Sequence, residues 1–121
     1  MQELSGRMEK LVQLGVRDII IDPGFGFSKT LEQNYDLLRN LGILHYFERP
    51  VLVGVSRKSM ITRPLDITPD QALPGTVAVN TIALLQGAAI LRVHDVEAAR
   101  QAVAITELTI GQHPLYTRIR S

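Results

Sequence analysis

Four residues of this chain have the types and positions that best fit a ligand site, namely Asp22, Lys58, Arg92 and His94. Each lies at or just after the end of a short apolar segment. A carboxylate accepts hydrogen bonds from amine groups of a ligand, and lysine, arginine and histidine donate to anions such as phosphate. The four residues together predict a site for a polar or anionic small molecule.

Arg92 carries the strongest part of this prediction. It interrupts the run "AILRVHD", which the pattern predicts to be buried, and an unpaired buried guanidinium is very costly. Arg92 and His94 are two residues apart, and alternate side chains of a strand point to the same face. Two donors on one face near a strand end predict a phosphate site.

Each of these residues also has a structural interpretation. Asp22 precedes Pro23 and is a favoured residue at the start of a turn. Arg57 and Lys58 are equally well explained as a solvated pair of loop residues. His94 is open to a role as a structural hydrogen-bonding partner.

Other ligand motifs are weak or missing. The segment "GFGF" (24–27) follows an apolar run with the pattern G-x-G, but it lacks the third glycine of a dinucleotide site. Phe27 and Lys29 would crowd the approach of a helix to the strand. The sequence has no P-loop pattern and no metal-ligand spacing, so we predict no metal ligands among its residues.

The residues above depend on three predicted strands. The segments "DIIID" (18–22), "PVLVGV" (50–55) and "AAILRV" (88–93) are short and continuously apolar. Continuous apolar runs are typical of parallel strands that are covered on both faces.

Helices are predicted before, between and after these strands. Apolar residues recur at helical spacing near 4–12, and again from Leu31 to Leu41, where Gly42 is the predicted end. Thr30 and Asp95 are predicted caps, Thr30 as part of a capping box with Gln33.

Two further helical segments are predicted in the second half of the chain. The run 68–71 predicts a helix start that Pro74 and Gly75 interrupt, and 76–87 predicts a buried helix. The tail 111–121 shows no pattern.

The alternation of helices and strands predicts an α/β fold with parallel strands and right-handed crossovers. In open α/β sheets and in β/α barrels, ligand sites form at the carboxyl ends of the strands. We therefore expect Asp22, Lys58, Arg92 and His94 to converge on one rim of the sheet.

Composition limits the class of protein. The chain has 121 residues, 45% of them hydrophobic, which suits one globular domain. A net charge of +1 gives no argument for nucleic acid or an acidic membrane, and no apolar run approaches the roughly 20 residues of a membrane span. The N-terminus is not a signal peptide, and the absence of cysteine fits a reducing compartment, so we expect a cytoplasmic protein.

Three blocks of the sequence closely resemble the dihydropteroate synthase family. They are "IIIDPGFGFSKT", "PVLVGVSRKSMI" and "GTVAVNTIALLQGAAILRVHDV", in which D-P-G-x-G-F, S-R-K-S and R-V-H-D match in identity, order and spacing. The resemblance extends from about Gly6 to about Val103. It implies the C-terminal part of a (β/α)8 TIM barrel, with about three parallel βα units preceded by a helix, and residues 1–121 as a single partial domain.

The resemblance also implies an activity. The family, a sulfonamide target, condenses 6-hydroxymethyl-7,8-dihydropterin diphosphate with 4-aminobenzoate to give 7,8-dihydropteroate and pyrophosphate. The resemblance further implies a Mg²⁺ ion, which is bound mainly through the substrate diphosphate and through the part of the barrel that this chain lacks. The implied partners are the small-molecule substrates, and no nucleic acid or membrane is implied. The resemblance also implies a homodimer or self-association of the chain.

Roles for single residues follow from the same resemblance. Lys58 and Arg92 are the implied catalytic residues. Asp22 binds the amino-pyrimidine edge of the pterin, Lys58 its carbonyl, and Arg92 stacks on the ring and reaches the diphosphate. The remaining implied substrate-binding residues are Gly26, which allows the turn to approach, Phe27 and Ser59, which contact the aminobenzoate, and His94, which binds the diphosphate.

Two alternatives remain open at this stage. The pterin-binding module of methyltetrahydrofolate-dependent methyltransferases shares a barrel and a pterin site, although methyl transfer needs no diphosphate site. A non-catalytic structural fragment is the second, since a barrel needs about 250 residues. We count three strands, which correspond to the last three of the eight in the family. We expect these strands to have two free sheet edges and an exposed inner face. The isolated chain should therefore self-associate and lack activity.

Overall fold

The computed structural model describes residues 20–26, 29–111 and 118–120. The helix predicted near 4–12 and the site residue Phe27 lie outside the described residues. The elements follow one another along the chain as α2 (Leu31–Arg39), the 3-10 helix η1 (Leu41–Phe47), β1 (Leu52–Val53), α3 (Ser59–Leu65), the 3-10 helix η2 (Pro69–Gln71), α4 (Leu73–Leu85), β2 (Ile90–Arg92), α5 (Val96–Ile110) and β3 (Arg118–Arg120).

The strands form a parallel sheet in the order β1-β2-β3. Leu52 pairs with Ile90 in β2, and Leu91 pairs with Ile119 in β3. Ile21 adds a parallel bridge to Val51, and this bridge is what the described residues contain of the strand predicted at 18–22. The parallel order predicted from the alternation of elements is confirmed.

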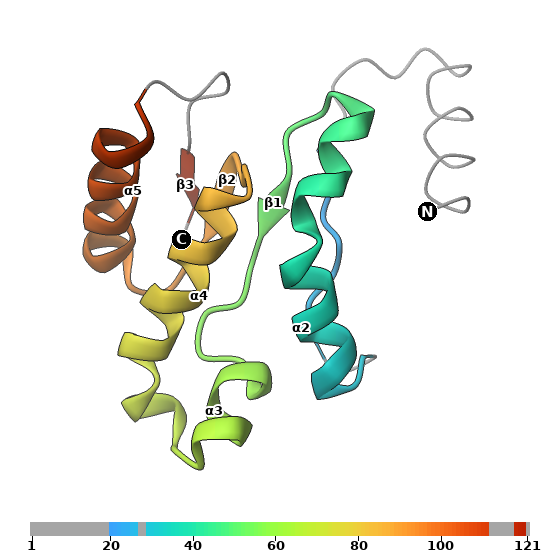
Figure 1. The fold of residues 1–121 in the computed structure, drawn as a ribbon. Coiled ribbons are helices and arrows are strands. Elements are labelled where there is room, and N and C mark those ends of the chain that lie inside the picture. Colours follow the sequence, from blue (N-terminus) through green and yellow to red (C-terminus); the bar gives the residue numbers. More distant parts are fainter. Residues whose placement is uncertain (1–19, 27–28, 112–117, 121) are drawn as a thin grey trace.

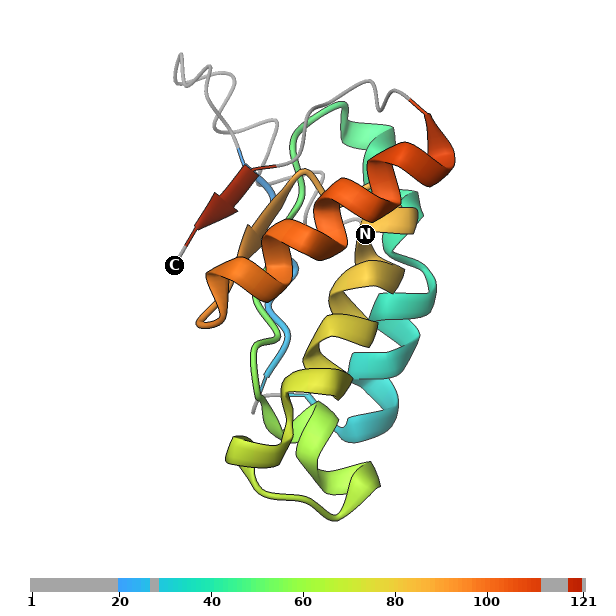
Figure 2. The ribbon, with the colours of Figure 1, turned by 90° about the vertical axis from the view of Figure 1, so that its left-hand side faces the viewer.

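The helices α2, α4 and α5 lie on one side of the strands (Figure 2) and flank β1 and β2 in the front view (Figure 1). The strands were expected to be covered on both faces, and in the described part of the chain the helices provide this cover on one face (Figure 2). A barrel has this arrangement, because its strands are covered by helices outside and by each other's side chains inside.

The core lies between the strands and these helices. Val51, Val53 and Val55 belong to it and are almost fully buried, together with Leu91 and Val93 of the β2 segment. Leu52, Ala89 and Ile90 form a second, smaller buried cluster. Leu52 is only 7% exposed, so the expectation that truncation uncovers the inner face of "PVLVGV" is wrong.

α2 begins as predicted and ends earlier than predicted. Thr30 and Gln33 form the predicted capping box, each side chain accepting a hydrogen bond from the other residue's backbone N–H. The helix ends at Arg39 and not at Gly42, because the side chain of Gln86 donates to the carbonyls of Leu38 and Arg39. These carbonyls are satisfied without another helical turn, and the chain continues as η1.

Three further expectations about the elements are corrected. Pro74 does not interrupt a helix: it lies in the first turn of α4, where proline is tolerated. Asp95 precedes α5, but its side chain does not cap that helix. The tail, which showed no pattern, contains β3, whose pairing with β2 depends on the backbone and not on a local sequence signal.

Among the described residues, no helix combines the length and the apolar character that crossing a membrane requires.

Candidate functional site

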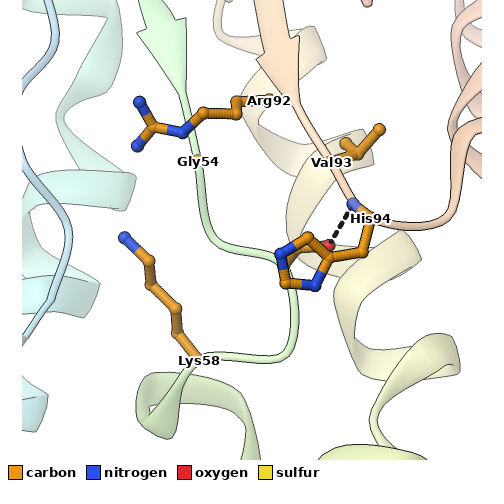
Figure 3. Close-up of a pocket in the computed structure, with 6 residues that line it drawn as sticks. Gly54, Lys58, Arg92, Val93 and His94 are labelled. Atoms are coloured by element: carbon orange, nitrogen blue, oxygen red, sulfur yellow. Dashed lines mark hydrogen bonds between the residues drawn. The ribbon is translucent and has the colours of Figure 1, made fainter. Parts of the chain in front are cut away.

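The carboxyl ends of β1 and β2 open into a pocket of about 370 Å³. Figure 3 shows Lys58 and Arg92 extending to the same side, with the ring of His94 nearby. The pocket is lined by Gly54, Ser56, Lys58, Arg92, Val93 and His94. The structure thus brings Lys58, Arg92 and His94 together, from segments that are more than 30 residues apart in the sequence.

Arg92 is not buried, contrary to the expectation from the sequence. Its side chain is 51% exposed, because the strand ends here at the open rim. The guanidinium lies over Gly54, where a Cβ atom would come within 2.6 Å of Nη2. Arg92 therefore presents its guanidinium at the pocket, and Gly54 provides the space for it.

Asp22 reaches the same rim. Its Oδ2 lies 3.6 Å from Nη1 of Arg92, and its Oδ1 accepts a hydrogen bond from the N–H of Gly24 at 2.9 Å. Gly24 has a φ of 74°, which favours glycine. Asp22 therefore begins a turn and also pairs with Arg92, a residue that lines the pocket, so the two interpretations of Asp22 are compatible.

The amine of Lys58 is fixed across the pocket. Its Nζ donates to the carbonyl of Phe25 at 2.7 Å. Burial, and then the nearby positive charge of Arg92, lower the pKa of Lys58, and the charge of Asp22 partly offsets this. Phe25 was not predicted as part of the site, because its contribution is a backbone carbonyl that has no sequence signal.

Gly26 lies beside this amine, since a Cβ atom at Gly26 would be 3.9 Å from Nζ of Lys58. The buried amide of Asn34 holds the turn by accepting from the N–H of Gly26 at 3.2 Å and donating to its carbonyl at 3.4 Å. Asn34 belongs to α2, so the cap at Thr30 and the position of the turn depend on the same helix. Asn34 was missed because an asparagine in a helical stripe resembles any solvated polar residue.

His94 and Ser59 occupy different positions relative to the pocket. The N–H of His94 donates to the hydroxyl of Ser56 at 3.2 Å, which joins the loop after β2 to the loop after β1. Ser59 is the first residue of α3, directly after Lys58, and is partly buried outside the set of lining residues.

The pocket has the charge of an anion site. Lysine, arginine and histidine converge there, and Asp22 is the acidic residue paired with Arg92. Within the described ranges, no three histidine, cysteine or acidic side chains form a cluster that could hold a metal ion. The residues of the pocket therefore do not fit a magnesium site, whereas they fit phosphate groups.

The family of the chain follows from comparison with known proteins. Residues 1–94 match the model of the pterin-binding enzymes. The chain belongs to the pterin-binding enzyme family.

Relatives in this family are similar over most of the chain. The dihydropteroate synthase of Escherichia coli (strain K12) is 48% identical over 93 residues, which is 77% of this chain and 33% of that protein. The crystal structure of the Yersinia pestis dihydropteroate synthase has 45% identity and a TM-score of 0.86, and the match covers 90% of this chain and 52% of that one. A second Yersinia pestis structure, a complex with a sulfonamide drug, has 44% identity and a TM-score of 0.87 over 92% of this chain and 41% of that one.

These matches show what part of the fold is present. The chain spans about a third of the length of the Escherichia coli dihydropteroate synthase. Its parallel strands, with helices on one side, are part of the TIM barrel of dihydropteroate synthases, and the predicted fold class is confirmed.

Proposed function

We propose that this chain is the C-terminal part of a dihydropteroate synthase, with residues 1–121 forming a single partial domain. The proposed reaction joins 6-hydroxymethyl-7,8-dihydropterin diphosphate to 4-aminobenzoate. The convergence of Asp22, Lys58, Arg92 and His94 at one rim is the observation that carries this proposal. The similarity to dihydropteroate synthases supports it.

The proposed mechanism depends on charge. The bond between the pterin methylene and the diphosphate oxygen breaks, and its electron pair leaves with the diphosphate. Lys58, Arg92 and His94 stabilise the negative charge that develops on this leaving group, as preorganised donors do in other sites. The aminobenzoate nitrogen then forms the new bond to the methylene and loses a proton, which the diphosphate can accept.

The other end of the pterin is assigned to Asp22, whose carboxylate matches adjacent N–H donors. The exposed guanidinium of Arg92 is flat and offers a surface for stacking on the ring. Gly26 allows the turn to approach the pterin. Phe27 and Ser59 are proposed to contact the aminobenzoate. The resemblance also implies Mg²⁺, which we assign to the substrate diphosphate and to no described residue.

A methyltetrahydrofolate-dependent methyltransferase module is the weaker proposal. Methyl transfer releases no diphosphate, so it gives no reason for three cationic or donor side chains around one pocket. A cationic rim of this kind favours the synthase.

Self-association is proposed for the same protein. Several large apolar side chains of α4 and α5 are exposed, namely Ile82, Leu85, Ile105 and Leu108. Exposed apolar side chains on neighbouring helices are typical of a surface that binds another protein, and we propose a homodimer through it. The proposed location is the cytoplasm, which fits a chain without cysteine.

Activity in a completed barrel tests the proposed function. We expect no turnover from the chain alone, and pyrophosphate release that requires both substrates when the chain is joined to the N-terminal part of the Escherichia coli relative. Arg92→Ala should lower catalytic efficiency at least about tenfold, because a hydrogen bond to a charged group contributes roughly 1.5–3 kcal/mol.

The matched control for this variant is Arg63→Ala. Arg63 is an exposed arginine of α3 that does not line the pocket. Near-normal kinetics of Arg92→Ala, or an equal loss in Arg63→Ala, would remove Arg92 from the proposed site.

A further inference from the structure

Arg57 and Asp95 join the two loops that carry the pocket residues. The Nε of Arg57 donates to Oδ2 of Asp95 at 3.0 Å, and its Nη2 donates to Oδ1 at 2.9 Å. The third nitrogen, Nη1, donates to the carbonyl of Pro69 at 2.7 Å. The guanidinium therefore uses all of its nitrogens in one geometry, which lysine cannot reproduce.

The backbone of Arg57 is fixed as well. Its φ is 53°, a conformation that costs energy for a residue with a side chain and persists where the surroundings enforce it. Its N–H donates to the hydroxyl of Thr76 at 3.1 Å, and this buried hydroxyl donates to the carbonyl of Ala72 at 2.7 Å. The loop after β1 is thus held by the start of α4 and by Asp95 at once.

Arg57 and Asp95 are sequence neighbours of two residues that line the pocket. Lys58 directly follows Arg57, and His94 directly precedes Asp95. Lys58 and His94 both line the pocket, whereas Arg57 and Asp95 do not. A bond between Arg57 and Asp95 therefore fixes the distance between the loops from which the two ligand-binding side chains project.

A simple surface ion pair does not explain this arrangement. The side chains of Arg57 and Asp95 are 24% and 26% exposed, and the residues are 38 positions apart. The pair Arg100–Glu97 has the same fork geometry, but it is 64% and 65% exposed and lies within α5. The hydrogen bond from Arg57 lowers the pKa of Asp95, so the carboxylate stays charged at neutral pH.

We propose that Arg57 and Asp95 are positioning residues, which hold Lys58 and His94 at the separation that a diphosphate group requires. Only the choice of ligand rests on the proposed function. The bond between the loops stands on the geometry of this chain alone.

Charge and geometry predict opposite effects for one substitution. Asp95→Asn removes a negative charge next to His94, so electrostatics alone predicts tighter binding of an anion. Loss of positioning predicts weaker binding. Arg57→Lys keeps the positive charge and removes the fork, and Arg100→Gln removes the comparable exposed pair of α5 as a control.

Two measurements on the full chain test the proposal. Hydrogen exchange at single amides uses the N–H of Lys58, which bonds to the carbonyl of Val55 at 3.1 Å, and the N–H of His94, which bonds to Ser56. We expect Arg57→Lys and Asp95→Asn each to speed exchange at both amides, although each variant changes one loop. Calorimetry with inorganic pyrophosphate should show binding weakened about tenfold or more, as misplaced groups cause in other sites.

Each outcome decides a separate claim. Faster exchange at both amides and weaker binding in both variants, with Arg100→Gln unchanged, supports the positioning role. Unchanged exchange, exchange that rises only in the altered loop, or tighter pyrophosphate binding by Asp95→Asn overturns it. A wild-type chain that fails to bind pyrophosphate counts against the proposed function, while the exchange result, which needs no ligand, still decides the role of the pair.

Discussion

At the scale of single residues, the absence of a side chain at Gly54 determines where the guanidinium of Arg92 can lie. This guanidinium lies where the Cβ atom of any other residue at Gly54 would be, 2.6 Å from Nη2 and 2.9 Å from Nε. Arg92 is a flexible and half-exposed side chain, so it can move away from such an atom at little cost. Gly54 thus affects where the charge lies more than whether the chain folds.

The first prediction follows from this contact. Gly54→Ala should weaken pyrophosphate binding at least about tenfold, because a displaced guanidinium loses a charged hydrogen bond to the ligand. The free energy of unfolding should change by less than about 1 kcal/mol. Calorimetry and urea unfolding on the same protein measure both quantities. Gly42→Ala is the control, since a Cβ atom there meets its nearest neighbour at an ordinary 3.6 Å.

The second prediction concerns the charge of Lys58. Burial and Arg92 both disfavour the protonated amine, so its pKa lies below the usual 10.5. The positive charge is therefore lost as the pH rises through a value lower than that of an ordinary lysine, and anion binding should fall there. Arg92→Leu removes one of the two causes and should raise the pKa of Lys58.

Amine labelling followed by mass spectrometry measures this pKa. The reagent reacts with the neutral amine, so the midpoint of the rate against pH should lie below 10.5 for Lys58 and move upward in Arg92→Leu. Lys29 provides a second labelled amine in the same sample. A Lys58 midpoint at or above 10.5 would contradict the assigned environment.

The site residues that sequence could reveal are those with a chemical side chain at a strand end. Asp22, Lys58, Arg92 and His94 met this description, and the structure brings them to one rim. Gly54 and the pair Arg57–Asp95 were not identified, because each acts through a partner that is distant in sequence. Local patterns contain no information on such pairings.

At the scale of elements, Gln86 links α4 to the end of α2. Its side chain accepts from the N–H of Gly42 and donates to the carbonyls of Leu38 and Arg39. His45 adds a hydrogen bond to the backbone carbonyl of Gln86 at 3.0 Å. Gln86 precedes β2, so this junction lies near the amino end of the strand and away from the pocket.

The third prediction separates stability from ligand binding. Gln86→Ala should lower the free energy of unfolding by roughly 1–3 kcal/mol, since backbone groups that are partly buried lose their partner. Pyrophosphate affinity should stay within about twofold, because distant and independent sites behave additively. Gln101→Ala, at an exposed glutamine of α5 whose side chain bonds to Glu97 of the same helix, should change neither quantity. A drop in affinity equal to the drop in stability would show that the two ends of the sheet are coupled.

The elements that sequence predicted well have local signals. The capping box at Thr30 and the apolar runs at 50–55 and 88–93 fall where α2, β1 and β2 are found. α3 was harder to recognise because Pro64 lies inside it. Pro74 was misinterpreted because its effect depends on whether it falls at the start or in the middle of a helix, and the pattern did not locate that start.

At the scale of the whole molecule, β3 pairs with the edge of β2 at which a barrel would close. β3 pairs in parallel with β2 on the side away from β1, so β3 and not β2 forms that edge of the open sheet. In a closed barrel every strand has two neighbours, so β2 has to pair with a strand of the remaining barrel on this side. An edge accepts one strand at a time. We therefore expect β3 and that strand to compete for β2 when the barrel is completed.

The last prediction uses a substitution that disfavours an extended backbone. Ile119→Pro should disrupt the pairing of β3, because proline holds φ at about −65°, away from the roughly −120° of a parallel strand, while Ile119→Val keeps a residue suited to a strand. Without β3, the edge of β2 is open to another chain, so sedimentation velocity should show more self-association for Ile119→Pro than for Ile119→Val. The same variant should bind the N-terminal part of a dihydropteroate synthase relative at least as tightly as the unaltered chain does, because no strand has to be displaced first. Weaker binding of that part by Ile119→Pro would show that β3 belongs to the completed fold, and that the barrel closes beside it rather than in its place.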